Sequence, residues 1–431
     1  MGVGGAYIGF AEGIEGVAVN PASSAVRDAF SVEHVDLDGT VSVVLPGFFA
    51  GTDFENRGAS ASSHGSVYDS FLSTELGGVL QLGDWGVAAL TRAQSFRVSA
   101  SSGAQLSMQI ARADVTVARS FFRKQLCIGI GVRAASMLLS GSGGTVGSLL
   151  AMGGVGLQAG VLVRPEQQRF RFGAAVRGPV FGSGEISSRA AFDAGGVRAA
   201  DGFVLPREVA LPAEVEAGVA VELGPRPLNP IWREPGEEEA PVRARVESRR
   251  RARQAALGRT LAAASAADRP ALRAEFSAAE AAIRAVDEAH LDASARSLLA
   301  ARKARAENAP RARVLVVASV TAAAPVTDGI AISSFLAQRY EPYGQQWTLT
   351  PRFGIESEPV TNRLVVRVGG YVEPARFSDA TPRQHLTFGG DVKLLPFDLF
   401  GLLPDTVWKL ALGVDVAPRY TNWALGFGVW H

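Results

Sequence analysis

Apolar and polar residues alternate along most of this chain. In VWKLALGVDV (residues 407–416), Trp408, Leu410 and Leu412 fall on one side of an extended chain, whereas Lys409 and Asp415 fall on the other. A period of two is typical of a β-strand whose two faces have different surroundings. The same alternation recurs in RLVVRVGGYVE, HLTFGGDVKL and EVEAGVAVEL. The pattern therefore predicts a protein built mainly from β-strands.

The alternating segments number about fourteen, which is an even count. Tight connections such as Gly83-Asp84 and 123–125 alternate with longer ones such as 185–205 and 326–345. This asymmetry is typical of outer-membrane barrels, with short periplasmic turns, long extracellular loops and, for an even count, both termini in the periplasm. The predicted strands span residues 30–45, 71–82, 85–98, 104–122, 126–140, 147–164, 170–184, 206–224, 313–325, 346–357, 363–375, 385–396, 406–417 and 422–431.

A soluble β-sandwich also alternates apolar and polar positions, and composition helps to separate the two folds. Hydrophobic residues make up 47% of the chain, charged residues only 20%, and the mean hydropathy is +0.13, yet no run of 18 apolar residues occurs. A chain that is apolar on average but not in long runs is typical of a transmembrane β-barrel. Aromatic residues at segment ends, such as Trp85, Phe122 and Trp347, suit interface girdles. We therefore predict an all-β transmembrane fold, an antiparallel outer-membrane barrel of about fourteen strands.

One segment, QLSMQIARADVTV, changes phase. Its apolar residues run through Met108 and Ile110 and then shift by one position to Val115 and Val117. A shift of this kind predicts a β-bulge at Ile110, Ala111 and Arg112. The alternative is a regular strand in which two small alanines blur the pattern.

The composition changes sharply between the predicted eighth and ninth strands. Alanine, arginine and glutamate dominate residues 236–310, and they favour helices, which we place at 241–265 and 269–307. The run SRRRAR suggests a nucleic-acid or anionic-lipid patch, but interleaved glutamates favour a solvated helix face. By strand parity this helical hairpin is periplasmic, and we interpret it as a docking arm for a protein partner. Its apolar stripe comprises Leu272, Phe276, Ile283, Val286 and Leu298.

The first residues, MGVGGAYIGFAEGIEGVAVNPAS, hold glycines too closely spaced for a strand or an independent helix. The polar interior of a barrel can satisfy such a backbone, so we expect residues 1–29 to form a plug in the lumen. The stretch resembles the N-terminal hatch of the FadL-type outer-membrane transporters of long-chain fatty acids and other hydrophobic compounds, and of the related PorV-type barrels. In both, a Gly-Gly-Ala stretch precedes Asn-Pro-Ala before the first strand. An ordinary turn is the alternative for Asn20-Pro21. The hatch and gate residues that the resemblance implies are Gly4, Gly5, Ala6, Asn20, Pro21 and Ala22.

The resemblance implies a fourteen-stranded barrel in which a hydrophobic ligand binds, the hatch shifts, and the ligand leaves sideways through a strand kink. The bulge at 110–112 is our candidate for that kink, although the resemblance favours the third strand and this one is the fourth. The sequence departs from the transporters in its helical insertion. It also ends on Trp430-His431, where such barrels usually finish on an aromatic residue.

Other chemistry is sparse in the sequence. A net charge of +1 argues against nucleic-acid binding, the single Cys127 forms no disulfide framework, and no Cys/His cluster has the spacing of a metal site. None of the five histidines accompanies a serine motif such as Gly-x-Ser-x-Gly, so we expect no enzyme, no metal and no cofactor. The inward charges have mixed sign, which favours a salt-bridged interior over an ion-selective pore. These charges are Arg133, Arg352, Arg367, Lys393, Lys409, Glu214, Glu216, Glu222, Glu356, Glu373, Asp391 and Asp415.

We divide the chain into a hatch (1–29), barrel strands (30–224), a periplasmic helical insertion (225–312) and further barrel strands (313–431). The predicted function is passive, hatch-gated transport of hydrophobic small molecules, fatty-acid-like by the resemblance, across a bacterial outer membrane. The apolar loop VVLPGFFAG (43–51) favours this reading, because such a ligand needs an apolar entrance. The alternative, favoured by the helical arm, is a PorV-like barrel that transports nothing and scaffolds a membrane or secretion complex. The sequence shown has no signal peptide at its start.

Overall fold

The computed structural model divides the chain into two units. A barrel unit comprises residues 1–29, 36–230 and 310–431, and a helical unit comprises 30–35 and 231–309. The residues that the structure describes are 2–27, 35–46, 53, 55–58, 67–99, 105–142, 147–186, 190–192, 198–200, 203–205, 209–225, 227–308, 310, 312–326, 329, 341–396 and 407–430. His34, His64, His431 and residues 47–51 of the predicted apolar loop lie outside them.

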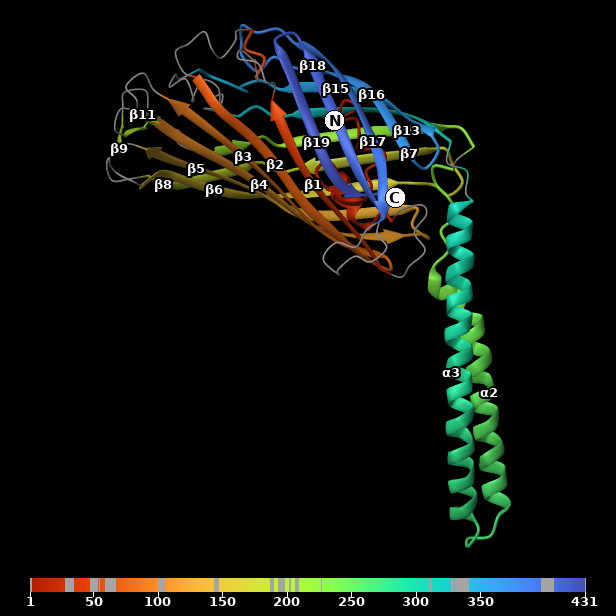
Figure 1. Cartoon of the computed structure of the whole chain (residues 1–431). Helices are drawn as coiled ribbons and strands as arrows, with labels where there is room; N and C mark the ends of the chain where they lie inside the picture. The colour runs from red at the N-terminus through yellow and green to blue at the C-terminus, as the bar shows by residue number, and fades with distance from the viewer. Residues whose placement is uncertain are drawn as a thin grey trace. The chain divides into compact units, whose positions relative to one another are not determined.

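The chain forms a closed antiparallel barrel of fourteen strands, as predicted (Figure 1). The first strand pairs with the last, through Thr40 to Gly428 and Pro46 to Asn422. Two of the fourteen strands are each interrupted once, so that β7 continues as β8 and β12 continues as β13. The strands of the barrel are β1 (Val35–Pro46), β2 (Val67–Leu82), β3 (Trp85–Ser99), β4 (Gln105–Phe121), β5 (Leu126–Ser142), β6 (Gly147–Val163), β7 (Phe170–Arg177), β8 (Val180–Ile186), β12 (Val209–Leu211), β13 (Glu214–Leu223), β14 (Val314–Ala323), β15 (Thr348–Val360), β16 (Leu364–Glu373), β17 (Arg383–Pro396), β18 (Val407–Ala417) and β19 (Tyr420–Val429). Three short strands, β9 (Ala190–Phe192), β10 (Arg198–Ala200) and β11 (Phe203–Leu205), form a separate small sheet.

The barrel wall is apolar outside and polar inside. On β13, Val215 and Val219 are exposed, whereas Glu216 and Glu222 are buried in the interior. On β15, Leu349 and Phe353 are 63% and 61% exposed. A soluble sandwich has the opposite polarity, so this arrangement excludes that fold and marks a membrane-spanning barrel. None of the helices described is long and apolar enough to cross a membrane.

The predicted bulge at Ile110, Ala111 and Arg112 is wrong. The pairing of β4 runs without a register shift from Gln105 to Arg119 against β3 and from Gln105 to Phe121 against β5. Met108 and Ile110 point inward and are buried, while Val115 and Val117 point outward and are exposed. The apolar residues of β4 switch sides because its inward face is polar along most of the strand and becomes apolar near the long-loop end. At that end the outward residue Gln109 is polar and exposed. A regular strand therefore produces the change of phase.

The strands β2 to β6 are longer than those opposite. They contain 15 to 17 residues each, whereas β13, β14, β16 and β19 contain 10. About ten tilted residues suffice to cross the hydrocarbon layer. The inner surface of β2 to β6 therefore extends beyond the layer on the side of the long loops.

The helical unit is an antiparallel hairpin of α2 (Pro235–Ala263) and α3 (Arg269–Glu307). α3 has the predicted bounds, while α2 begins six residues earlier than predicted, with Pro235 in its first turn. Ion pairs join the helices: Arg253 Nε lies 3.0 Å from Glu280 Oε2, and Arg253 Nη2 lies 2.8 Å from Asp287 Oδ2. Of the predicted apolar stripe, Ile283 and Val286 are exposed, whereas Leu272, Phe276 and Leu298 are half-buried. Phe276 and Leu298 each lie one turn from a buried charged residue of α3, Glu280 and Arg302, so both border the contact with α2.

Candidate functional site

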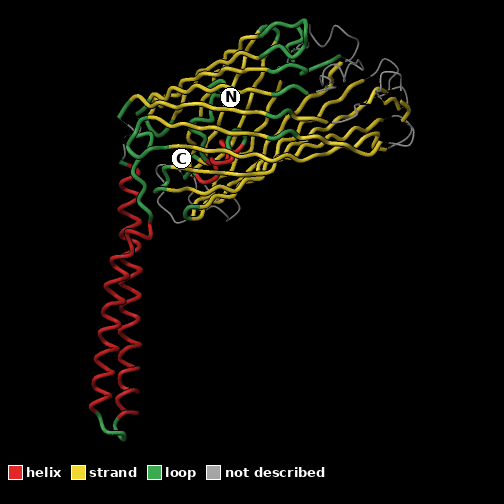
Figure 2. Tube along the Cα trace, turned by 180° about the vertical axis from the view of Figure 1, so that it is seen from behind, coloured by secondary structure: helices red, strands yellow, loops and turns green. Residues whose placement is uncertain are grey.

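The N-terminal segment lies inside the barrel as a plug, which we call the hatch (residues 2–27). It contains a short helix α1 (Gly13–Val17) and a 3₁₀ helix η1 (Pro21–Ala25), both visible among the strands in Figure 2. Asn20 is fully buried and caps η1, because its Oδ1 accepts a hydrogen bond from the Ala22 N–H at 3.0 Å. Its Nδ2 donates to the Val161 carbonyl of β6, also at 3.0 Å. Asn20 therefore both shapes the hatch and ties it to the wall.

Glycines of the wall make room for the hatch. A Cβ on Gly86 would lie 1.8 Å from the Ser24 carbonyl oxygen, and one on Gly129 would lie 2.4 Å from the Pro21 carbonyl carbon. A Cβ on Gly160 would lie 2.1 Å from Asn20 Oδ1. These three glycines lie on β3, β5 and β6, so the backbone of η1 packs directly on the backbone of the wall.

Polar side chains fasten the hatch elsewhere. Glu12 binds Arg171 of β7, and Glu15 binds Lys409 of β18. Thr387 Oγ1 accepts from the Gly4 N–H at 2.9 Å and donates to the Gly2 carbonyl at 3.0 Å. Contacts from widely separated strands of the barrel thus hold the plug in the lumen.

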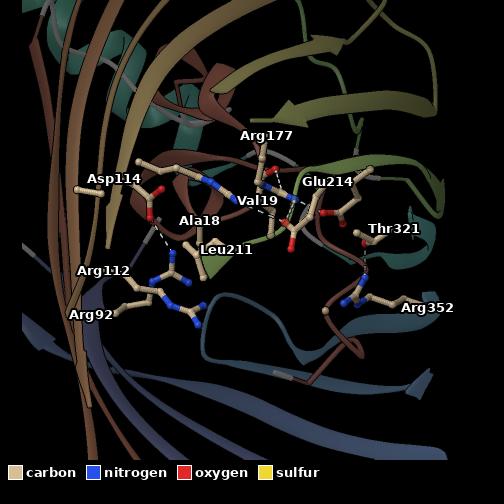
Figure 3. A pocket seen from close by; sticks show the side chains of 14 residues that line it. Ala18, Val19, Arg92, Arg112, Asp114, Arg177, Leu211, Glu214, Thr321 and Arg352 are labelled. Carbon is tan, nitrogen blue, oxygen red and sulfur yellow. Dashed lines mark hydrogen bonds and ion pairs between the residues drawn. The ribbon is translucent and has the colours of Figure 1, made fainter. Parts of the chain in front are cut away.

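A cavity of about 290 Å³ lies between the hatch and the wall. The hatch contributes Gly5, Ala18 and Val19 to its lining, and charged residues of the wall supply much of the rest (Figure 3). These charged residues are Arg92, Arg112, Asp114, Arg133, Arg177, Glu214, Glu216 and Arg352. With five arginines against three carboxylates, the lining carries an excess of positive charge. Such a cavity suits an anionic group.

Two of these arginines face each other across neighbouring strands. Arg92 on β3 pairs in register with Arg112 on β4, and Figure 3 shows their guanidinium groups together. Arg92 Nη2 lies 2.7 Å from Asp114 Oδ2, and Gln158 Nε2 donates to the other oxygen of Asp114 at 3.1 Å. No carboxylate of the described residues forms an ion pair with Arg112 within 4.0 Å. Arg112 therefore has charge available for an incoming anion.

Apolar side chains border this pair towards the long-loop end of the strands. Phe96, Met108, Leu139 and Leu150 form one row across β3, β4, β5 and β6, because each is in register with the next. Ile110, Met137 and Met152 form a second, parallel row. All seven side chains point inward and are at most 7% exposed. We call them the apolar rows; the second begins at Ile110, two residues from Arg112 on β4 and in register with Gln94 on β3.

The opposite side of the lumen is a salt-bridged network. Arg367 bridges Glu356 and Asp391, with Nε to Glu356 Oε2 at 2.7 Å and Nη1 to Asp391 Oδ1 at 2.7 Å. Further along, His385 lies between two carboxylates, 2.8 Å from Asp415 and 3.0 Å from Glu373. Several of the mixed-sign inward charges predicted from the sequence, such as Arg367 and Asp391, are thus brought together as ion pairs. On this side Arg352 of β15 reaches the cavity, where it donates to Thr321.

The wall beside the cavity is interrupted. Gln158 of β6 pairs with Arg177, and Gly153 pairs with Ser183, so the register shifts by one residue between them at Gly178-Pro179, where the Gly178 N–H donates to the Leu157 carbonyl at 2.7 Å. Across the next strand the break continues at Pro212, whose carbonyl accepts from Arg133 Nη2 at 2.7 Å. Arg177 itself donates to Glu216 at 2.9 Å and to the hatch carbonyl of Val19. One arginine thus touches the hatch, the cavity and the edge of the break.

The structure brings some of the predicted site residues together in the hatch, and it shows other site residues that the sequence did not indicate. Gly4, Gly5, Ala6, Asn20, Pro21 and Ala22 all lie in the hatch; Gly4 and Gly5 have φ of 64° and 77° and form its turn. Arg112, assigned to a kink, instead lines the cavity, and the strand break occurs at Gly178-Pro179. The apolar rows went unnoticed, although three of the chain's four methionines belong to them.

Comparisons with known proteins find a likeness in structure only. No family model matches the chain, and no curated relative does. The solved structures similar to it include the TodX monoaromatic hydrocarbon channel, as a deltaS2 mutant, with a TM-score of 0.47, 14% identity and coverage of 100% of this chain and 99% of that one. A FadL homologue from Pseudomonas aeruginosa has a TM-score of 0.46 and 11% identity over 99% and 96% of the two chains. The CymD monoaromatic hydrocarbon channel has a TM-score of 0.44 and 11% identity over the same shares. We therefore argue the function from this chain's own residues.

Proposed function

We propose that this protein is a bacterial outer-membrane channel for apolar small molecules that carry an acidic group, such as long-chain fatty acids. The observation that carries the proposal is the adjacency of the apolar rows to Arg92 and Arg112. Phe96, Met137 and Met152, which are packed in this structure, part to admit the tail of such a molecule, and its carboxylate reaches Arg112. Methionine side chains adapt to irregular apolar partners, which suits ligands of varied shape.

The hatch gates the passage. In the closed state the hatch lies beneath the cavity, held by Asn20, by the ion pairs of Glu12 and Glu15, and by Arg177. A molecule in the cavity competes with Val19 for Arg177 and so loosens the plug. The transport is passive diffusion down a concentration gradient.

We place the way out of the cavity at the break at Gly178-Pro179, where the backbone would part from β6, since a Cβ on Gly156 would lie 2.6 Å from the Pro179 carbonyl oxygen in this closed arrangement. Arg177 and Leu211, at its edges, line the cavity on the inside. On the outside, Leu157 and Phe181 are 73% and 59% exposed and flank the break. An apolar tail that crosses the break therefore meets an apolar outer surface and not water.

Photolabelling tests this proposal. A diazirine-bearing C16 fatty acid and its methyl ester are added to the protein in lipid nanodiscs, and the labelled peptides are identified by mass spectrometry. We expect the acid to label the strand segments that carry the apolar rows. Loss of a charge-assisted hydrogen bond worth about 1.5–3 kcal/mol should weaken labelling roughly 10- to 100-fold in Arg112→Gln.

Matched variants separate charge from folding. Arg112→Lys retains the charge and should retain much of the labelling. Arg119→Gln removes an arginine from the outward side of the same strand and should change nothing, since Arg119 packs over the Trp85 ring, 5.1 Å from its centroid. Equal labelling by acid and ester, unaffected by Arg112→Gln, refutes selection of an acid; absence of labelling in the apolar rows refutes the channel itself.

A barrel that scaffolds a protein complex is the second candidate function. The observation in its favour is the exposure of Ile283 and Val286 on α3. Photolabelling and uptake distinguish the two, because a scaffold binds no apolar acid in its lumen.

A further inference from the structure

The helical hairpin buries charged side chains beside apolar ones such as Val246 and leaves other apolar side chains exposed. Its inner contact carries charges, since Glu280, Asp287 and Arg302 are only 5%, 7% and 7% exposed. Its outer surface carries apolar groups, since Ile283 is 37% and Val286 is 68% exposed. A hairpin in water normally buries its apolar side chains first. The charged contact fixes how α2 and α3 pair, and the apolar side of α3 is left for something else.

A line of apolar residues on α3, half-buried at Leu272 and Phe276 and exposed at Ala279, Ile283 and Val286, follows a coiled-coil spacing. Leu272, Phe276, Ala279, Ile283 and Val286 are separated by 4, 3, 4 and 3 positions. This repeat places them in one line along α3 and is the pattern that receives another helix by knobs-into-holes packing. We call these five residues the apolar seam. The charged contact with α2 runs directly beside this line, through Glu280 and Asp287, with Phe276 one turn from Glu280.

Arginines lie on the same face of the hairpin as the seam. The ion pair of Arg250 with Glu288, at 3.9 Å, marks one face. At about 100° per residue, Ile283 and Val286 lie on the other side of the buried Asp287 around α3. Arg245 and Arg249 likewise lie on the other side of the contact residues Val246 and Arg253 around α2. The seam and these two arginines therefore share the second face.

This face is cationic as well as apolar. Arg245 and Arg249 are exposed, and no carboxylate of the described residues lies within 4.0 Å as their ion-pair partner. Ala252 and Ala256 continue the arginine side of α2. We call the seam with Arg245 and Arg249 the docking face. None of its residues is acidic, so a second copy of the same face offers no charge to match the arginines.

We infer that the docking face receives an amphipathic helix of another protein, with an apolar heptad stripe against the seam and carboxylates beside Arg245 and Arg249. The apolar stripe supplies the contact area, and the carboxylates set orientation and partner choice. The inference is independent of any ligand in the barrel, because it rests on the hairpin alone.

Site-specific photocrosslinking in the native membrane tests the inference. The photoreactive residue p-benzoylphenylalanine is placed at position 286 of the full chain or, as a control, at position 288. Val286 and the side chain of Glu288 are equally exposed, at 68%, and lie on opposite faces. Crosslinked peptides are then sequenced by mass spectrometry.

We expect position 286, and not 288, to crosslink to an acidic amphipathic segment of a different polypeptide. The double variant Arg245→Glu/Arg249→Glu should lower the yield at least fivefold, whereas Arg251→Glu, whose side chain is 81% exposed, should leave it unchanged. Ile283→Gln should lower the yield without altering charge. Equal yields at 286 and 288, a crosslink to a second copy or to the chain's own barrel, or a partner segment without acidic residues would each overturn the inference.

Discussion

Asn20→Ala should loosen the hatch while leaving the barrel intact. The substitution removes the hydrogen bond from the Ala22 N–H and the one to the Val161 carbonyl, each 3.0 Å long. The buried Ala22 N–H then lacks its partner, which costs about 1–3 kcal/mol, and loss of the bond to the Val161 carbonyl adds about 1 kcal/mol. Together these values give about 2–4 kcal/mol, and since 1.4 kcal/mol corresponds to a factor of ten, the open hatch becomes roughly 30- to 700-fold more populated.

Hydrogen–deuterium exchange in lipid nanodiscs measures this population. Amides of residues 2–27 should exchange at least about 30-fold faster in the variant, because exchange follows local opening. Amides of β3 to β6 should exchange at the normal rate. Asn422→Ala is a matched control, since Asn422 donates to Tyr420 at 3.2 Å within β19. Hatch exchange within threefold of the unaltered protein, or acceleration of hatch and strands together, would refute this account of how the hatch is held.

Three further changes have defined outcomes. Gly129→Leu places a side chain where Pro21 lies, with even its Cβ 2.4 Å from the Pro21 carbonyl carbon, so the barrel should assemble with residues 2–27 accessible to protease, and a protected hatch would contradict the packing. Met137→Asp puts a charge into the apolar rows and should abolish labelling by the fatty acid in the fraction of protein that migrates as a folded barrel on gels; retained labelling of that fraction would show that the ligand lies elsewhere. In the hairpin, the hydrogen bonds from Arg253 lower the pKa of Glu280 and of Asp287. Their stabilising effect is therefore complete above the ordinary carboxyl pKa of about 4 and is lost as pH falls through the lowered values. Spin labels at positions 252 and 285 should accordingly keep one distance between pH 5 and 8 and separate only below about pH 4, whereas separation on raising the pH would contradict the sign.

The alternation of apolar and polar residues was sufficient to predict the barrel, because a membrane barrel repeats one physical constraint in every strand. It failed at Ile110 because alternation reports which side is apolar and not where the backbone bends. The interior of the barrel turns apolar near its long-loop end, and this produces the same change of phase as a bulge. The true break at Gly178-Pro179 had a signal in the sequence, since proline lacks the N–H that a strand donates.

The candidate site was harder to predict than the fold. Register decides which inward residues meet, and the meeting of Arg92 with Arg112, or of Met137 with Met152, depends on pairing across strands that a single sequence does not reveal. The same limit applies to the glycines of the wall. Gly86, Gly129 and Gly160 look like weak points of separate strands, and only the folded barrel brings all three beneath η1.

Native mass spectrometry of the barrel, extracted gently from its own outer membrane, tests the central claim most directly. The account predicts a bound apolar molecule with an acidic group, identified after release, present in the unaltered protein and in Arg119→Gln but lost in Arg112→Gln. A barrel that is empty in all three forms, or that carries a neutral molecule with equal occupancy in all three, would contradict it.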